Sequence, residues 1–437
     1  MTTDSYDAIV VGASLAGCTA AILMAREGAR VALVERHERP ESHKHLCTHF
    51  IQPSALPVLQ RLGLDRLIEE AGGLRNSVEV HSPSGWIGHR LGLGSDGSPL
   101  HGYNIRRLRL DPMARALAAR TPGLAMMTGR SARALIERDG RICGVELAGH
   151  EGQMSLIARL VVAADGRHSE LARMADVPAR SSPNLRFGAM VTMRKVDLRR
   201  GTTSQMWFNG PEITYVFPND DNFTVIAAMC PKDRHEEYLR DPLEFVKGQV
   251  RALPDAPQLN AAELIGPVLT IKDYPNLWRP RVVRGMALVG DAMTSVDFLW
   301  GVGCGWAFQS GAWLCDSVSA ALRIGDDLTP ALRRYDRLCS GLSPHRFLIN
   351  DFSRRLSMNP IERLMFAAAA KDANMARHFN RFGARIDGPV KFLSPAALLK
   401  AVWVNLRQSV ALPDGTRHSA ASAPAEPVTP QIERAAQ

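Results

Sequence analysis

The chain has 437 residues, of which 46% are hydrophobic and 22% charged, so its composition is that of a globular protein and not of a disordered one. Its seven cysteines contain no Cys-x-x-Cys pair, which argues against a disulfide scaffold or a metal site and favours a reducing cytoplasm. The formal net charge is +9, but the basic residues are dispersed, so no nucleic-acid surface is expected. Neither a secretory signal nor a transmembrane run of about 18 apolar residues is present.

The N-terminal segment predicts a strand–helix–strand unit. Residues 8–11 and 31–34 are short apolar runs, and residues 15–27 between them are rich in alanine with helical spacing. Residues 54–71 also have the spacing of a helix. This alternation is typical of an α/β fold.

Two further elements are expected before residue 170. Residues 110–120 predict a helix with Asp111 as its cap and Pro112 at its first position. Residues 160–164 form an apolar strand that ends in Asp165 and Gly166. Each of these segments places polar residues at the end of a regular element.

The predicted secondary structure changes in the second half of the chain. Strand-like runs broken by Asn, Asp, Gly and Pro predict an antiparallel sheet over residues 186–229. A strand is expected again at residues 286–289, followed by a long helix after Trp300. Residues 345–409 are mainly helical and basic. From about Pro413 the composition is that of a disordered tail.

A phosphate-binding turn lies between the first strand and the first helix. Gly12 permits the tight turn, Ser14 replaces the usual middle glycine, and Gly17 allows helix and strand to pack closely. Glu35 closes the second strand, where an acid binds an adenosine ribose hydroxyl. Free N–H groups at the helix start favour pyrophosphate. The sequence therefore predicts a dinucleotide site at Gly12, Ser14, Leu15, Ala16, Gly17, Glu35 and Arg36.

Two later segments indicate a flavin. The stretch Asp165–Arg173 reads D-G-R-H-S-E-L-A-R and resembles the D-G-x-x-S-x-x-R segment of the group A flavoprotein monooxygenases. Gly290 and Asp291 follow an apolar strand, as in the second G-D motif of that family. Arg107, in Arg-x-x-Leu-Asp, is similar to the arginine that reaches the pyrophosphate there. The resemblance spans about residues 5–345.

This resemblance implies FAD as cofactor and NADPH or NADH as electron donor, with no separate nicotinamide domain. Besides the first site, it assigns FAD contacts to Arg107, Asp165, Gly166, Gly290, Asp291, Gly301, Val302, Gly303, Cys304 and Gly305. It implies an α/β fold in four parts. These are a discontinuous Rossmann-type FAD domain (residues 1–75, 106–180 and 281–344), an inserted antiparallel sheet domain for substrate (76–105 and 181–280), a helical region (345–411) and a disordered tail (412–437).

The chain departs from that family near the chemistry. Thr294 and Phe298 stand where histidine and proline are usual, and Gly305 stands where asparagine is common. The segment Lys44–Cys47 resembles the C-G segment of the geranylgeranyl-reductase branch, with Thr48 in place of glycine. The Trp-x-Trp signature of the flavin halogenases is missing. These departures leave the FAD prediction intact and keep the reaction type open.

Polar candidates for the chemistry are His49 and Asp297, each of which could equally be a satisfied structural residue. Cys47 and Cys304 are expected to be small packing residues. Strand alternation suggests that about half of the large residues in the inserted sheet face the substrate. The predicted substrate pocket comprises Cys47, Met206, Trp207, Tyr215, Phe217, Phe298 and Trp300.

The preferred function is a cytoplasmic FAD-dependent monooxygenase, monomeric or homodimeric, that uses O2 to hydroxylate or epoxidise an apolar small molecule of secondary metabolism. One alternative is a flavin-dependent reductase of prenyl double bonds, which would draw electrons from a separate reductase. A second alternative is a non-catalytic small-molecule carrier that kept the flavoprotein fold. Reducible bound flavin and product-coupled O2 consumption distinguish the three.

Overall fold

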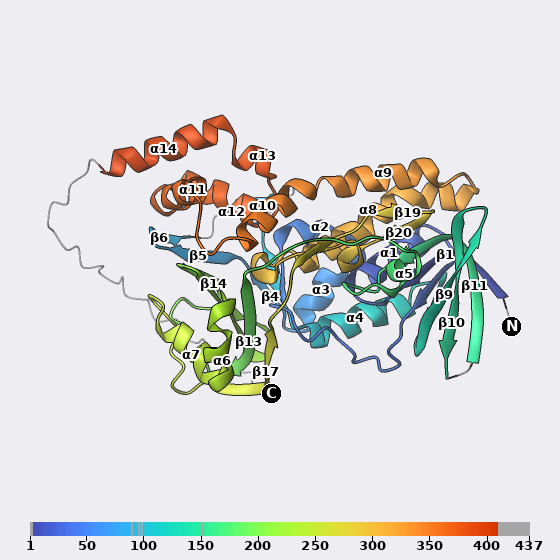
Figure 1. Ribbon diagram of the computed structural model, residues 1–437, viewed down its shortest axis with the longest axis horizontal. Coiled ribbons are helices and arrows are strands. Elements are labelled where there is room, and N and C mark those ends of the chain that lie inside the picture. The colour runs from blue at the N-terminus through green and yellow to red at the C-terminus, as the bar shows by residue number, and fades with distance from the viewer. Residues whose placement is uncertain (1–2, 89–90, 95–96, 98, 151, 410–437) are drawn as a thin grey trace, which may run out of the picture.

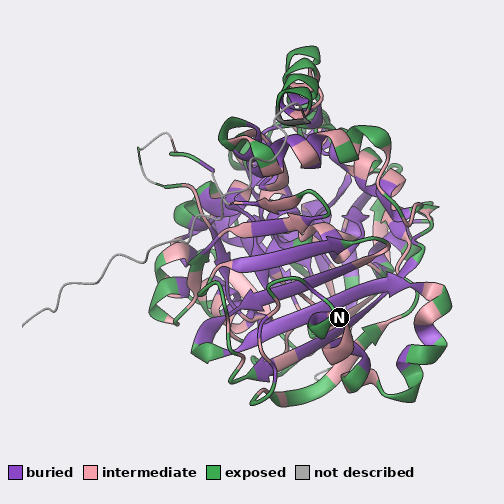
Figure 2. Cartoon of the chain, turned by 90° about the vertical axis from the view of Figure 1, so that its left-hand side faces the viewer, coloured by how far each residue is buried: buried purple, intermediate pink, exposed green. Residues whose placement is uncertain are grey.

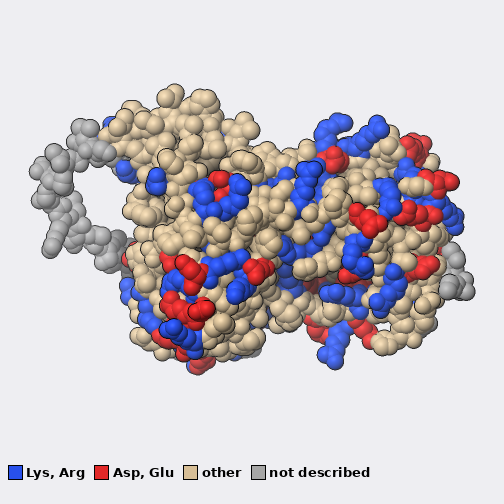
Figure 3. All heavy atoms as spheres, in the orientation of Figure 1, with Lys and Arg blue, Asp and Glu red and all other residues tan. Residues whose placement is uncertain are grey.

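The computed structural model describes residues 3–88, 91–94, 97, 99–150 and 152–409 of the chain. The predicted tail at residues 412–437 lies outside the described residues. The described chain is organised around two large sheets and a set of C-terminal helices (Figure 1). Basic and acidic side chains are interspersed over the face shown in Figure 3.

The first large sheet has eight strands and carries the N-terminal strand. Its members are β1 (Thr3–Val11), β2 (Val31–Val34), β8 (Leu124–Met127), β9 (Arg130–Arg138), β10 (Arg141–Gly149), β11 (Gly152–Ala163), β19 (Val282–Val283) and β20 (Met286–Leu288). The spatial order is β19-β20-β11-β1-β2-β8, with every pair from β20 to β8 parallel and β9–β10 as a hairpin beside β11. Strands β2 and β20 are buried on both faces, as a covered parallel sheet requires. Figure 2 shows that strands inside the molecule are mostly buried, whereas exposed residues lie mainly on the outer helices and loops. The α/β prediction is confirmed.

Helices pack around this sheet. They are α1 (Leu15–Arg26), α2 (Leu56–Leu62), α3 (Leu64–Glu70), α4 (Arg107–Ala119), α5 (Glu170–Met174), α8 (Gly303–Ile324) and α9 (Thr329–Ser340). Helix α1 is buried along almost its whole length, and its residues share one core with β1, β2, β11 and α8. None of the described helices is long and apolar enough to cross a bilayer.

The second large sheet has seven strands and confirms the antiparallel sheet predicted for residues 186–229. Its strands are β5 (Val78–Ser82), β6 (Gly85–Ile87), β13 (Arg186–Arg194), β14 (Ser204–Asn209), β15 (Glu212–Pro218), β16 (Thr224–Pro231) and β17 (Glu263–Ile271). The order is β17-β13-β16-β15-β14-β5-β6, and only β14 and β5 pair in parallel. One face packs on α6 (His235–Arg240) and α7 (Pro242–Arg251), and the other packs on the C-terminal helices.

Two small sheets join the large ones. One contains β3 (Phe50–Ile51), β4 (Leu74–Asn76) and β7 (Gly102–Asn104), and the other contains β12 (Arg180–Ser182), β18 (Asn276–Trp278) and β21 (Thr294–Ser295). The C-terminal region is helical, as predicted. Its helices are α10 (Ser343–Ser353), α11 (Pro360–Lys371), α12 (Ala373–Gly383), α13 (Pro389–Phe392) and α14 (Pro395–Ser409).

Two sequence predictions of helix bounds are wrong. Helix α4 begins at Arg107, so Pro112 lies inside it and Asp111 is not its cap. The helix starts early because the backbone N–H of Arg107 donates to His49 Nδ1, while the Asp111 carboxylate accepts from Arg107 itself. The helix predicted over residues 54–71 is broken at Gly63, whose left-handed backbone (φ 75°) separates α2 from α3.

Helices α1 and α8 approach each other until their backbones nearly touch. A Cβ atom on Gly311 of α8 would lie 2.7 Å from the carbonyl oxygen of Ala16 and 2.9 Å from Cβ of Thr19. Both neighbours belong to α1, and the first is rigid backbone. Only glycine at position 311 permits this spacing, and the close contact holds the N-terminal halves of the two helices together.

We therefore predict that Gly311→Val forces α1 and α8 apart and lowers the free energy of unfolding by at least about 1–3 kcal/mol. Gly248→Ala in α7 is the matched control, because its new Cβ meets only the far end of Arg251 at 3.9 Å. The control should change stability by less than about 1 kcal/mol, in the stabilising direction. Denaturant unfolding of both variants measures the difference, and equal stabilities would contradict the packing argument.

Candidate functional site

The N-terminus of α1 offers an open anion site. Gly12 has φ 107°, and a Cβ there would lie 2.4 Å from the carbonyl oxygen of Ala164. A Cβ on Gly17 would lie only 1.8 Å from the Gly12 carbonyl oxygen, so both positions require glycine. Ser14 is the N-cap but makes no side-chain cap hydrogen bond, which leaves the first-turn N–H groups at Leu15 and Ala16 without a side-chain partner. Such a helix start binds phosphate.

Glu35 lies at the end of β2 beside this turn. Its Oε2 accepts from the backbone N–H of Ala13 at 2.9 Å, and its Oε1 accepts from that of His37 at 3.0 Å. The carboxylate is therefore fixed next to the Gly12 turn. Arg36 is exposed and its Nε donates to His37 Nε2 at 3.2 Å, so the structure directs it to the surface and not to the turn.

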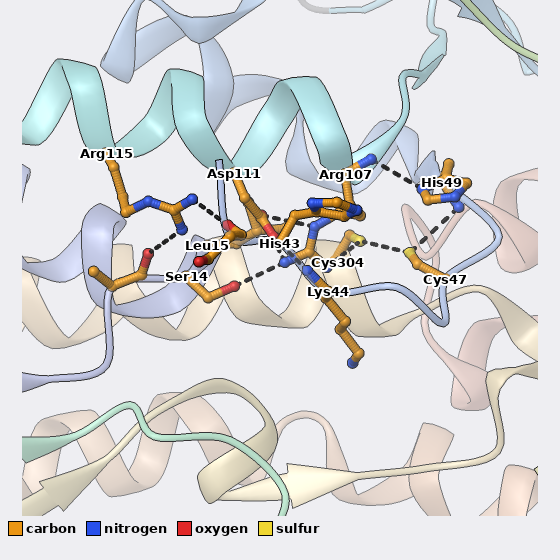
Figure 4. A network of polar contacts seen from close by, with 12 residues as sticks. Ser14, Leu15, His43, Lys44, Cys47, His49, Arg107, Asp111, Arg115 and Cys304 are labelled. Carbon is orange, nitrogen blue, oxygen red and sulfur yellow. Dashed lines mark hydrogen bonds and ion pairs between the residues drawn. The ribbon is translucent and has the colours of Figure 1, made fainter. Parts of the chain in front are cut away.

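A buried ion pair connects the turn to α4 (Figure 4). Arg107 Nη2 lies 2.7 Å from Asp111 Oδ1 and donates to Ser14 Oγ at 2.7 Å. The second Asp111 oxygen accepts from the backbone N–H of Lys44 at 3.0 Å. Burial opposes the charge on Arg107, but the Asp111 carboxylate and the neighbouring Cys304 and Cys47 sulfurs together outweigh it, and the pKa of Arg107 rises. A fixed guanidinium thus lies one hydrogen bond from the phosphate-binding turn.

The D-G and G-D motifs follow β11 and β20, two adjacent strands of the parallel sheet. Asp165 Oδ2 accepts from the backbone N–H of Leu171 at 3.0 Å, whereas Oδ1 is buried without a hydrogen-bond partner. Desolvation raises the pKa of Asp165. Gly290 (φ 57°) lies against α1, since its Cβ would be 2.7 Å from that of Ala16. Gly166 also has a positive φ and meets open space.

Asp291 forms an ion pair across the site. Its Oδ2 accepts from Lys44 Nζ at 2.8 Å, and the two residues are 247 positions apart in the sequence. The carboxylate is partly exposed, so it is open to a further partner. Sequence reasoning missed Lys44 as a site residue, although it begins the reductase-like segment. The signal was weak because the ion pair depends on tertiary structure alone.

A second open helix start lies beside the first. Helix α8 begins after Gly301, which has φ 59°, and its N-cap Val302 has no side chain that could cap it. A Cβ on Gly303 would meet nothing within 4 Å, and one on Gly305 would meet nothing closer than 3.7 Å. Cys304 Sγ lies 3.8 Å from Cys47 Sγ (Figure 4), and this contact lowers the pKa of the Cys47 thiol. The predicted flavin loop is therefore sterically open.

Arg115 is a further residue that sequence reasoning missed. It lies two turns after Arg107 on α4 and donates to the backbone carbonyl of Ala13 at 3.4 Å and to those of Pro40 and Ser42 (Figure 4). The eight-residue spacing on one helix face was the available signal. Arg115 holds the Gly12 turn against the loop that carries Lys44.

The two polar candidates have structural partners. His49 is buried with φ 60°, and its Nδ1 accepts from the backbone N–H of Arg107 at 3.0 Å. Asp297 is 1% exposed, and it accepts from the backbone N–H of Leu299 at 3.1 Å and from Ser353 Oγ at 2.8 Å. Burial raises the pKa of Asp297. The structure gives both residues positioning contacts, and neither lines the cavity described next.

An apolar cavity of about 320 Å³ lies between the seven-stranded sheet and the C-terminal helices. Four of the predicted pocket residues line it: Met206, Tyr215, Phe217 and Trp300. Gln52 and Gly301 also line it, and Gln52 Nε2 donates to the carbonyl of Trp300 at 2.8 Å. Because Gly301 leads directly into α8, the cavity ends beside the open start of that helix.

Three predicted pocket residues are not brought to this cavity. Trp207 alternates with Met206 and Phe208 along β14, so it faces the other side of the sheet, where its Nε1 donates to the carbonyl of Pro254 at 2.9 Å. Phe298 packs against Gly188 and Tyr274, with 5.5 Å between the Phe298 and Tyr274 ring centroids. Cys47 faces Cys304 instead. None of these three predicted pocket residues lines this cavity.

These features fit an FAD molecule. The two open helix starts, the glycine positions that exclude any Cβ and the orphaned Asp165 Oδ1 lie around one region. The α1 start would hold the pyrophosphate with Arg107, Glu35 would hold the adenosine ribose, Asp291 the ribityl chain and the α8 start the flavin ring. Among the described residues, no cluster of His, Cys, Asp and Glu could hold a metal ion.

Comparison with known proteins agrees with this geometry. The FAD binding domain family matches residues 5–325 of the chain. The digeranylgeranylglycerophospholipid reductase of Methanocaldococcus jannaschii is 25% identical over 346 residues, which cover 76% of this chain and 82% of the reductase.

Two solved structures share the fold. The p-nitrophenol 4-monooxygenase PnpA from Pseudomonas putida DLL-E4 superimposes with a TM-score of 0.74 at 16% identity, covering 89% of this chain and all of that one. The flavin-dependent brominase Bmp2 gives 0.74 at 16% identity, covering 92% of this chain and all of that one.

We predict that Arg107→Ala leaves Asp111 as an unpaired buried charge and lowers the free energy of unfolding by about 3–5 kcal/mol. The variant should also purify with little flavin. Arg120→Ala is the control, because Arg120 is exposed at the end of the same helix. Flavin absorbance relative to protein and denaturant unfolding measure both effects, and an Arg107→Ala protein with full flavin would refute the assigned role.

Proposed function

Because the chain belongs to the FAD binding domain family and is an FAD-dependent oxidoreductase, we propose that it is a monooxygenase that uses O2 to hydroxylate or epoxidise an apolar small molecule, with NADPH or NADH as electron donor. The observation that carries this proposal is the aromatic-walled cavity that ends at Trp300 and Gly301, beside the start of α8. Such a cavity can hold an apolar substrate next to a flavin ring.

Bound FAD supplies the redox chemistry and the activation of O2. The protein must orient the substrate and exclude water from the reacting atoms. The ring of Phe208 is suited to this, since its centroid lies 5.0–6.0 Å from those of Phe366, Trp300 and Phe352. This aromatic cluster joins β14, the loop before α8 and the C-terminal helices into one wall.

Besides holding the flavin ring, the backbone N–H groups at the start of α8 would stabilise negative charge. Their partial positive charge favours negative charge that develops on a neighbouring group. No acid or base on the chain is required to be the reactive species, which agrees with the structural partners found for His49 and Asp297.

A second candidate function is the reduction of prenyl double bonds. It is favoured by the archaeal reductase, whose identity to this chain (25%) exceeds that of the monooxygenase PnpA (16%). The apolar cavity would also accept a prenyl chain. A monooxygenase consumes O2 as it forms product, whereas a prenyl reductase does not.

Rapid mixing of the reduced holoenzyme with O2 tests the proposal. A monooxygenase should show a transient absorption spectrum that differs from those of oxidised and reduced flavin and that lasts longer when substrate is bound. NADPH or NADH should reduce the flavin without another protein. Direct reoxidation with no transient, together with strict dependence on a separate reductase, would favour the prenyl reductase.

A pair of conservative variants tests the cavity wall. Phe208→Leu and Phe187→Leu each replace a buried ring on the seven-stranded sheet, but Phe208 faces the cavity and Phe187 faces α6 and α7. Both should lower stability by a similar amount, of order 1–3 kcal/mol. Only Phe208→Leu should release more hydrogen peroxide per NAD(P)H consumed. An equal peroxide yield from the two variants would show that this wall does not shield the chemistry.

A further inference from the structure

One end of the cavity carries polar atoms that have no partner. Trp300 Nε1, His345 Nε2 and Arg385 Nε are all buried, and none of them has a hydrogen-bond partner. All three residues line the cavity, from the loop before α8, from α10 and from the turn after α12. Buried polar groups without partners cost free energy, so three in one place indicate a missing partner.

Arg385 is held at this end by its surroundings. Its Cζ lies 5.3 Å from the ring centroid of Phe382 and 5.9 Å from that of Trp300, and its Nη1 donates weakly to the Phe382 carbonyl at 3.4 Å. The backbone of Arg385 has φ 62°, an uncommon conformation for a residue other than glycine. The ring of His345 stacks on the ring of Phe382, with 5.5 Å between the two centroids.

No carboxylate within the described part of the chain pairs with Arg385. Asp351 and Glu362 also line the cavity, but each accepts from Arg355, at 2.6 Å and 2.7 Å. Burial lowers the pKa of Arg385 to about 10, and no acidic neighbour offsets it. Burial together with the Arg385 charge lowers the pKa of His345 to about 3, so His345 is neutral at pH 7 while Arg385 remains charged.

We propose that Arg385, together with Trp300 Nε1, binds the carboxylate of an otherwise apolar substrate. This inference rests on the proposed function, because it treats the cavity as the substrate site. A guanidinium binds a carboxylate through paired, charge-assisted hydrogen bonds. Among the described residues that line the cavity, Arg385 is the only Lys or Arg, so it neutralises one negative charge. A carboxylate matches that single charge, whereas a phosphate dianion would leave charge uncompensated.

The assignment also gives the substrate a direction. The carboxylate would lie at Arg385 and Trp300, against the C-terminal helices, and the apolar body would extend along the side of the seven-stranded sheet that bears Met206, Tyr215 and Phe217. Arg385 is a specificity-determining residue in this arrangement, since it favours an acid over the corresponding ester or alcohol.

Binding to the oxidised holoenzyme tests the inference without any turnover. The probes are matched sets, namely cinnamate with methyl cinnamate and cinnamyl alcohol, and geranate with geraniol and geranyl phosphate. Dissociation constants come from changes in flavin absorbance and in tryptophan fluorescence. We expect each acid to bind about tenfold to hundredfold more tightly than its ester or alcohol. Arg385→Gln should abolish this preference, and Arg385→Lys should keep part of it.

Arg346→Gln is the matched control. Arg346 also lies over an aromatic ring, with its Cζ 4.3 Å from the centroid of Trp278, but it does not line this cavity. Arg346→Gln should leave the preference for each acid over its ester or alcohol unchanged. Arg385→Gln should melt no lower than the unmodified protein, because it removes a partly buried charge that no described carboxylate pairs with.

Several results would overturn the inference. They are an acid that binds no better than its ester, a preference that survives in Arg385→Gln, tighter binding of geranyl phosphate than of geranate, or no binding by any acid. The outcome is independent of oxygen chemistry. A protein that binds acids through Arg385 but forms no oxygenated product would refute the monooxygenase proposal and leave the binding assignment intact.

Discussion

The contact between α1 and α8, where Gly311 meets Ala16 and Thr19, is the constraint on which the site depends. No side chain fits between these helices or between α1 and the Gly12 turn, so two uncapped helix starts lie within one small region. Each start presents backbone N–H groups and a partial positive charge. A cofactor whose diphosphate binds at one helix start and whose electron-accepting ring binds at the other satisfies both. The eight-stranded sheet, which shares one core with α1 and α8, fixes the distance between the two helix starts.

The charged residues around the cofactor region are separate from the apolar wall of the cavity. The buried Arg107–Asp111 pair, Lys44 and Asp291 lie around the cofactor region, whereas aromatic rings dominate the cavity wall. Asp351 and Glu362 also reach the cavity but pair with Arg355, whereas no carboxylate in the described chain pairs with Arg385. Burial of an unpaired charge destabilises a fold unless a ligand compensates it, so its retention is more readily explained by recognition than by stability.

The cofactor half of the site could be predicted from the sequence, because its requirements are local. Gly12, Gly17 and Gly290 are needed for backbone reasons that a short motif records. The remainder depends on tertiary structure. Which side of β14 bears the cavity decides between Met206 and Trp207, and a strand pattern alone could not choose. Pro112 suggested a helix start at the wrong residue, because the true start is set by His49, 58 positions away.

The arrangement of the chain has a consequence for its synthesis. Strand β1 pairs with β11, and α1 packs on α8, so residues 3–26 are synthesised long before their partners at residues 152–163 and 303–324. Contacts this distant in sequence form slowly, and α1 is apolar on nearly every side. During synthesis α1 therefore lacks its α8 partner until residue 303 and beyond have emerged, and exposed apolar surface of this kind favours aggregation. The half of the cofactor site at the start of α8 forms last.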